Sequence, residues 1–226
     1  MPLNNWHLFD DVPGVAREAA RRILTAADRE ITAKGRFSIV LAGGGTPEST
    51  YRLLVDADTD WSKWHIYFGD ERCLPIDDVE RNSVMAASAW LDHVTIPDEN
   101  IHPIPAEQGA EAGASAYSLL IADAVPFDMV LLGMGEDGHT ASLFPGQIHS
   151  DSELVHAVHD APKPPPDRIS LSRNALSDCM ELLILVTGAS KQQAVTRWKQ
   201  GGNLPIANIG AHDAVDILLD KDAAGA

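Results

Sequence analysis

The sequence FSIVLAGGGTP at residues 37–47 contains the repeating unit that decides the fold. Its first six residues form a mainly apolar run of strand length, which predicts a short buried strand. The three glycines predict a tight turn, and Pro47 suits the first turn of a helix that we expect to reach about Val55. The unit is therefore a strand, a glycine turn and a helix.

The same unit recurs along the chain, where apolar runs alternate with segments of helical periodicity. The expected strands are residues 65–68, 127–132, 169–172, 181–187, 204–208 and 215–219, and the expected helices are residues 12–33, 82–91, 110–124 and a last one that ends near residue 200. Strands that alternate with helices favour an α/β fold whose sheet is mainly parallel and covered by helices on both faces.

Composition and charge limit the classes of function. The chain has 226 residues, of which 45% are hydrophobic and 22% charged, so it can bury a sizeable core. We expect one domain over residues 1–226, with a frayed tail at residues 221–226. The formal net charge of −16 disfavours binding to nucleic acid or anionic lipid. The apolar runs are far shorter than the ~20 residues of a membrane span.

Cysteine usage and the N-terminal segment bear on the compartment. Cys73 and Cys179 are the only cysteines, too few for a disulfide framework or a four-cysteine zinc site. The first residues lack the basic and apolar stretches of a secretory signal. We therefore expect a cytoplasmic protein, and the sequence leaves the oligomeric state open.

Four polar loops follow predicted strands, at residues 43–47, 69–72, 136–140 and 188–191. In an open parallel sheet, the loops at the carboxyl ends of the strands converge on one crevice, where ligands bind. We therefore expect these loops to build one site.

The glycine loop is the candidate phosphate-binding element. Gly43, Gly44 and Gly45 allow a ligand to approach the backbone closely, and Thr46 can cap the following helix. Free N–H groups at the start of a helix favour a phosphate. The glycine spacing matches neither the dinucleotide-binding fingerprint nor the P-loop, so a plain tight turn is the alternative.

Cations are needed beside a phosphate in a chain this acidic, and residues 82–162 contain no Lys or Arg. Arg72 could clamp an anion or form a surface pair with Glu71. Lys191 lies at a helix start, where its charge opposes the helix dipole unless an anion or another partner offsets it. Arg168 flanks a predicted strand and is a further candidate, although single arginines are usually surface residues.

His139 is the candidate general base, because it closes a glycine-rich loop after a buried strand. Imidazole titrates near neutral pH and can accept a proton from water, and Asp137 can orient it. The alternative is a metal site with Asp137, His139 and Asp70 as ligands, which no paired His or Cys at ligand spacing supports. We therefore expect no catalytic metal at these residues.

Four motifs resemble those of the 6-phosphogluconolactonases in order and spacing. They are LAGGGTP at residues 41–47, GDER at 69–72, GMGEDGHTASLFP at 133–145 and TGASK at 187–191, and RISL at 168–171 is also similar. The resemblance extends from about Leu8 to Leu219. The motif at 133–145 is specific, whereas the glycine loop is shared with the related glucosamine-6-phosphate deaminases.

The resemblance implies a three-layer, Rossmann-like α/β fold and the hydrolysis of 6-phospho-D-glucono-1,5-lactone in the oxidative pentose phosphate pathway. The partner would be this small phosphorylated lactone, and no cofactor would be needed. His139 would activate water, Asp137 would tune it and Asp70 would position a hydroxyl or the water. The 6-phosphate would bind at the loop from Gly43 to Thr46, with charge from Arg72, Arg168 and Lys191.

Two other functions stay open at this point. A glucosamine-6-phosphate deaminase or isomerase is disfavoured by two departures from the deaminase pattern. Arg72 follows the Asp-Glu pair where deaminases typically carry an aromatic residue, and Leu143-Phe144-Pro145 stands where they carry Asn-Glu-Pro. A non-catalytic sugar-phosphate sensor would use the same crevice without turnover.

Overall fold

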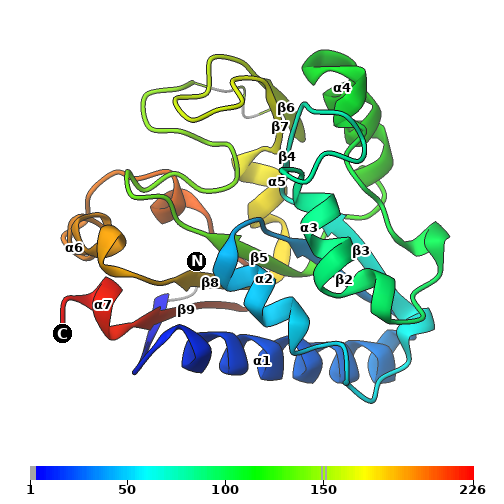
Figure 1. Cartoon of the computed structure of the whole chain (residues 1–226), viewed down its shortest axis with the longest axis horizontal. Helices are drawn as coiled ribbons and strands as arrows, with labels where there is room; N and C mark the ends of the chain where they lie inside the picture. Colours follow the sequence, from blue (N-terminus) through cyan, green and yellow to red (C-terminus); the bar gives the residue numbers. More distant parts are fainter. Residues whose placement is uncertain (1–3, 149, 151) are drawn as a thin grey trace.

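The computed structural model describes residues 4–148, 150 and 152–226. Its centre is a six-stranded sheet in the order β1-β9-β8-β5-β2-β3, and every neighbouring pair is parallel (Figure 1). The strands are β1 (Asn4–Phe9), β2 (Phe37–Leu41), β3 (Trp64–Phe68), β5 (Phe127–Gly133), β8 (Cys179–Val186) and β9 (Ala214–Asp220). The prediction of a mainly parallel α/β sheet is confirmed, although β1 had not been expected.

Seven α-helices and six short 3-10 helices connect the strands within the described residues. The α-helices are α1 (Val12–Lys34), α2 (Gly45–Arg52), α3 (Asn82–Ala89), α4 (Ala110–Ile121), α5 (Arg173–Ser177), α6 (Gln192–Lys199) and α7 (Lys221–Ala224). The 3-10 helices are η1 (Trp61–Lys63), η2 (Leu91–His93), η3 (Asp98–Asn100), η4 (Ala106–Gln108), η5 (Ala189–Lys191) and η6 (Ile206–Asn208). No helix built from these residues is long and apolar enough to cross a membrane.

The long helix α1 follows from its sequence. Asp11 caps it by accepting the N–H of Gly14, and Gly35 ends it in a left-handed conformation. Its apolar face, which includes Val15, Ala19 and Ile23, is buried. Figure 1 shows α1 lying along one face of the sheet, where it contacts β2, β5, β8 and β9.

A second, smaller sheet corrects the expectation that residues 69–72 form a loop. The strands β4 (Asp70–Arg72), β7 (Arg168–Leu171) and β6 (Val155–Val158) form an antiparallel sheet in the order β4-β7-β6. Asp70 pairs with Ser170, and Arg72 pairs with Arg168. A polar segment of three residues carries no strand pattern of its own, because its ladder is supplied by the distant β7.

Two other expectations are wrong. Residues 204–208 form no strand but a turn that ends in η6, because Pro205 takes a helical conformation and the N–H of Asn208 bonds to its carbonyl. Residues 221–226 are not a frayed tail. Asp220 caps α7 by accepting the N–H of Ala223, and the side chain of Ala223 is fully buried.

The order of the strands places a crevice between β2 and β5. The chain goes from β2 to β3 on one side and returns to β5 on the other side of β2. The loops that leave β2 and β5 therefore diverge, and a crevice opens at the carboxyl ends of the two strands. The glycine loop and the loop that contains His139 both begin there.

Candidate active site

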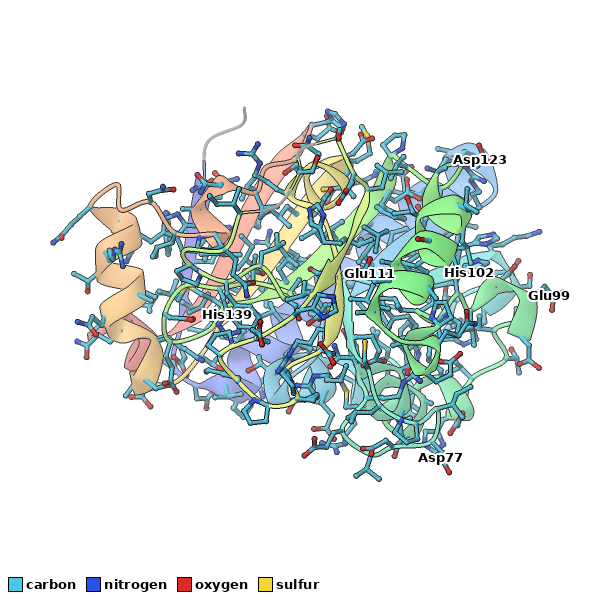
Figure 2. All side chains as sticks on the ribbon, turned by 90° about the horizontal axis from the view of Figure 1, so that it is seen from above. Asp77, Glu99, His102, Glu111, Asp123 and His139 are labelled. Atoms are coloured by element: carbon cyan, nitrogen blue, oxygen red, sulfur yellow. The ribbon has the colours of Figure 1, made fainter. Side chains whose placement is uncertain are left out.

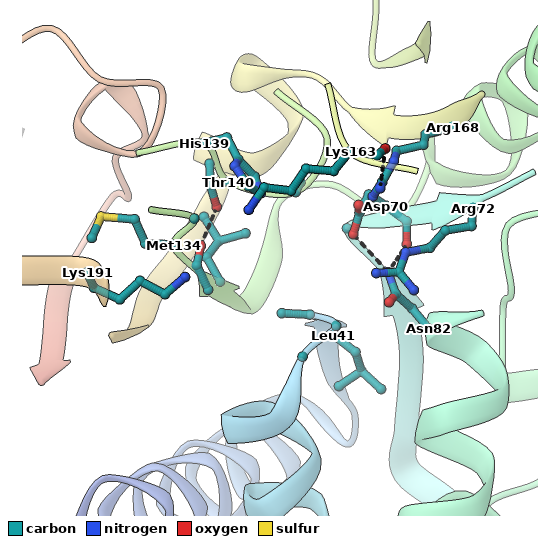
Figure 3. A pocket seen from close by; sticks show the side chains of 18 residues that line it. Leu41, Asp70, Arg72, Asn82, Met134, His139, Thr140, Lys163, Arg168 and Lys191 are labelled. Carbon is teal, nitrogen blue, oxygen red and sulfur yellow. Dashed lines mark hydrogen bonds between the residues drawn. The ribbon is translucent and has the colours of Figure 1, made fainter. Parts of the chain in front are cut away.

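A pocket of about 220 Å³ opens at this crevice (Figure 3). Seven of the ten predicted site residues line it, namely Gly43, Gly44, Asp70, Arg72, His139, Arg168 and Lys191. Gly45, Thr46 and Asp137 lie beside it in the same loops. Figure 3 shows His139 and Lys191 on one side of the pocket and Asp70, Arg72 and Arg168 on the other. The predicted cations therefore face the pocket from two sides and do not surround one point.

His139 and Asp137 form a hydrogen-bonded pair. The distance from Nδ1 of His139 to Oδ1 of Asp137 is 2.5 Å, and the same oxygen accepts the backbone N–H of His139. Burial lowers the pKa of His139 below its usual value, and the carboxylate of Asp137 opposes this effect. The imidazole is therefore neutral at neutral pH, with Nδ1–H donated to Asp137 and Nε2 left as the proton acceptor.

Asp137 is fixed as the charged partner of this pair. Burial alone would raise its pKa, but the hydrogen bonds from His139 outweigh burial and the pKa lies below its usual value. A carboxylate in this position can stabilise an imidazolium at His139.

The loop conformation depends on Gly135. Its N–H bonds to the carbonyl of His139, which folds the loop back on itself. A Cβ atom at residue 135 would lie 2.0 Å from Nδ1 of His139 and 2.8 Å from Oδ1 of Asp137. Only glycine therefore leaves room for the pair.

Asp70 presents its carboxylate to the pocket from β4 and is held by two neutral donors. Ser142 donates to one carboxylate oxygen at 2.7 Å, and the side-chain amide of Asn82 donates to the other at 3.0 Å. Asn82 reaches this position because Gly43 has no side chain, since a Cβ there would lie 2.1 Å from Oδ1 of Asn82. The sequence did not predict a role for Asn82, nor for Ser142, which lies within the motif at residues 133–145.

Glu71 points away from the pocket and has a different task from Asp70. Its fully buried carboxylate accepts the backbone N–H groups of Asn82 and Ser83, at the start of α3, and lies 3.5 Å from the guanidinium of Arg81. The expected surface pair between Arg72 and Glu71 is therefore not formed by their side chains. Arg72 bonds instead to the carbonyl of Glu80, and its buried Nε has no hydrogen-bond partner among the described residues.

The glycine loop and Lys191 meet at the other side of the pocket. The hydroxyl of Thr46 lies 2.6 Å from that of Thr187, which joins the start of α2 to the segment leading to η5. Thr46 is not the cap of α2, because the helix begins at Gly45 with Gly44 as its N-cap. Burial lowers the pKa of Lys191, a cost that a bound anion would relieve.

Arg168 lines the pocket, yet most of its donors bond to protein groups. Nε donates to the carbonyl of Pro165, and Nη2 donates to the carbonyls of Lys163 and Pro164. Only 6% of the residue is exposed. The sequence could not show this engagement, because all three acceptors are backbone oxygens.

Lys163 is a cation of the pocket that sequence reasoning missed. It belongs to the proline-rich segment at residues 162–166, which we had interpreted as a surface loop, and its side chain lines the pocket. Figure 3 shows it reaching towards His139 and Thr140. A signal was present, because Lys163 is the first basic residue after the stretch 82–162 that has none.

The metal alternative finds no donor set in the described part of the chain. Among residues 4–148, 150 and 152–226, no group of three or more His, Cys, Asp and Glu side chains is placed to hold a metal ion. Asp137 and His139 face each other, and both carboxylate oxygens of Asp70 accept hydrogen bonds from neutral donors.

Comparisons with known proteins agree on one family. The family model for glucosamine-6-phosphate isomerases/6-phosphogluconolactonase matches residues 10–218. The 6-phosphogluconolactonase of Mycobacterium leprae is 39% identical over an alignment of 238 positions, and that of Mycobacterium tuberculosis is 38% identical over 236; both alignments cover 96% of each chain. The crystal structure of 6-phosphogluconolactonase from Thermotoga maritima superposes with a TM-score of 0.91 at 26% identity, covering 97% of this chain and 100% of that one.

Proposed function

The chain belongs to the family of glucosamine-6-phosphate isomerases and 6-phosphogluconolactonases, and we propose that it acts as the lactonase. It hydrolyses 6-phospho-D-glucono-1,5-lactone to 6-phospho-D-gluconate, a step of the oxidative pentose phosphate pathway. The observation that carries the mechanism is the pair of His139 and Asp137 at the wall of a pocket that also presents several cations.

In the proposed reaction His139 acts first as a base. Nε2 takes a proton from a water molecule while the water oxygen adds to C1 of the lactone, giving a tetrahedral intermediate. The intermediate then collapses with cleavage of the bond between C1 and the ring oxygen. His139 returns the proton to that oxygen, which leaves as a hydroxyl group. Asp137 stabilises the imidazolium between the two steps.

The 6-phosphate is proposed to bind where the start of α2 approaches Lys191. The first N–H groups of α2 have no partner within the helix, and Lys191 adds a positive charge beside them. Arg72 is proposed to face the lactone from the opposite side, where its guanidinium can donate to the oxygen that becomes negative as water adds. The carboxylate of Asp70 is proposed to accept a hydrogen bond from a hydroxyl of the sugar or from the attacking water.

The proposed compartment is the cytoplasm. Cys73 and Cys179 are both free thiols, and burial raises the pKa of Cys73 to about 11. Protonated thiols of this kind are stable in a reducing compartment and react slowly.

The test is the rate of acid release from freshly made 6-phosphogluconolactone after subtraction of the spontaneous rate. A rate above background that saturates with substrate is expected. Release of ammonia from glucosamine 6-phosphate would assign the deaminase activity instead. Binding of either sugar phosphate without turnover would identify a sensor.

A further inference from the structure

The loop between β6 and β7 is closed at its base and carries Lys163 near its tip. Nδ1 of His159 lies 2.7 Å from Oδ1 of Asp167, and the N–H of Ala161 donates to the carbonyl of Pro166. Nε2 of His159 lies 3.1 Å from the carboxylate of Glu111 on α4, which Figure 2 labels. The base of the loop is therefore tied across itself and to a helix.

Arg168 holds the tip of this loop from below. Its Nε and Nη2 donate three hydrogen bonds to the carbonyl oxygens of the successive residues Lys163, Pro164 and Pro165, with N···O distances of 3.0–3.1 Å. The guanidinium is planar and rigid, so it can donate to all three carbonyl oxygens only when the backbone of residues 163–165 adopts one particular conformation. The hold is buried, because Arg168 is 6% exposed.

The same guanidinium also rests on the loop that contains His139. Its central carbon lies 5.8 Å from the centre of the Phe144 ring, and the Phe144 ring lies 4.7 Å from that of His139. A cation over an aromatic face is attracted to it. Arg168 therefore joins the loop of Lys163 to the loop of the base.

From this fixed tip the side chain of Lys163 extends into the pocket (Figure 3). Three charged groups shift the pKa of His139: Asp137 from its own loop and Asp70 from β4 raise it, and Lys163 lowers it. The charge of Lys163 also lowers the pKa of Lys191, which lines the same pocket. Lys163 is thus the cation that faces the imidazole.

We propose that Arg168 is a positioning residue, which fixes the backbone of residues 163–165 so that the ammonium group of Lys163 stands in front of His139. The proposal rests on the proposed function for its kinetic readout. It differs from the expectation that Arg168 supplies charge to the phosphate, because its effect passes through Lys163.

The test follows the pH dependence of kcat/KM for the phosphorylated lactone in the wild type, Lys163→Met and Arg168→Lys. The Lys163→Met variant removes a positive charge that holds the pKa of His139 down. We therefore expect the acid limb to move to higher pH by roughly 0.5–1 unit. Arg168→Lys keeps a charge at residue 168 but cannot hold three carbonyls, so the limb should move in the same direction.

The control and the double variant separate positioning from general damage. Lys63→Met changes an exposed lysine of η1, outside the pocket, and should leave the profile unchanged. The double variant should shift the limb no further than Lys163→Met alone, since both changes act through one charge. An unchanged limb in Lys163→Met or in Arg168→Lys, or shifts that add in the double variant, would overturn the proposal.

A second variant and an NMR titration test the positioning role even if Arg168→Lys does not fold or the protein shows no turnover. If Arg168→Lys does not fold, Pro165→Gly loosens the same backbone without touching Arg168 and should move the limb upward. NMR titration of His139 in the wild type and in the Lys163 variant needs no turnover. A wild type without lactonase activity but with the expected NMR shift would contradict only the proposed function, whereas an active enzyme with no shift would contradict only the positioning.

Discussion

At the scale of single residues, His139 can act as a base only while its imidazole is neutral. Burial lowers its pKa below the ~6.5 of free histidine, and Asp137 limits how far the pKa falls. The two effects keep Nε2 unprotonated at neutral pH while Nδ1 stays bonded to the carboxylate. The pair therefore joins an available base with a charge that supports its protonated form.

Replacement of His139 by Ala should lower kcat by about 100-fold or more and leave KM nearly unchanged, because the proton acceptor is lost but no phosphate contact is removed. Steady-state kinetics with the spontaneous rate subtracted measures both constants. A variant with wild-type kcat would remove His139 from the mechanism.

The pH dependence gives a second prediction at this scale. In the wild type, activity should fall as pH drops through the lowered pKa of His139, so the acid limb of kcat/KM lies below pH ~6.5. Asp137→Asn removes the group that raises this pKa, and the limb should move to still lower pH while the plateau rate falls. A limb that moves to higher pH would contradict the assignment of Asp137.

At the scale of elements, two buried carboxylates accept backbone N–H groups at helix starts, and one of these helices, α3, supplies Asn82 to the pocket. Glu71 accepts the first N–H groups of α3, and Asp220, at the end of β9, accepts N–H groups from two separate segments. Asp220 accepts the N–H of Ala223 in α7 and the N–H of Gly188, just before η5 and Lys191. These carboxylates therefore link the starts of the helices to loops of the proposed site.

Glu71→Gln should lower the free energy of unfolding by about 1–3 kcal/mol, because the amide cannot accept all the hydrogen bonds of the buried carboxylate at the start of α3 and Arg81 keeps only its pair with Glu107. Both partners are buried, since the side chains of Glu71 and Arg81 are 0% and 1% exposed. The matched control is Glu48→Gln, whose exposed pair with Arg52 is worth ~1 kcal/mol at most. Urea unfolding compares the two, and equal losses would refute the role of Glu71.

Asp220→Ala and Asp11→Ala remove the N-caps of α7 and α1, and each should cost about 0.5–2 kcal/mol of stability. Only Asp220→Ala should also raise KM for the phosphorylated lactone, because Gly188 and the following Lys191 lose their anchor. Asp11 lies at the start of α1 and serves as the control. If KM changed equally in both variants, the contact of Asp220 with Gly188 would have no specific role in phosphate binding.

At the scale of the whole molecule, the sequence predicts what local patterns determine. The apolar runs at 37–42 and 127–132 predict the two strands that flank the crevice, and the glycine-rich loops after them predict its walls. Elements that owe their form to distant partners escaped prediction. β4 forms only by hydrogen bonding to β7, and α7 depends on its cap Asp220 and on the burial of Ala223.

The same distinction applies to the candidate site. His139, Asp70 and Lys191 follow or flank predicted strands and could be expected in one crevice. Lys163 could not, because its loop returns to the pocket only through the pairing of β6 with β7 and the hold of Arg168. The engagement of Arg168 by backbone carbonyls has no sequence signature at all.

The central claim is that one pocket recognises the phosphate and activates water for attack on the lactone. The measurement that tests it most directly is kcat/KM for 6-phosphogluconolactone beside unphosphorylated gluconolactone, with spontaneous hydrolysis subtracted. We expect turnover that strongly favours the phosphorylated lactone, and Lys191→Ala should reduce this preference mainly through KM. Equal turnover of both lactones, or no rate above background with either, would contradict the account.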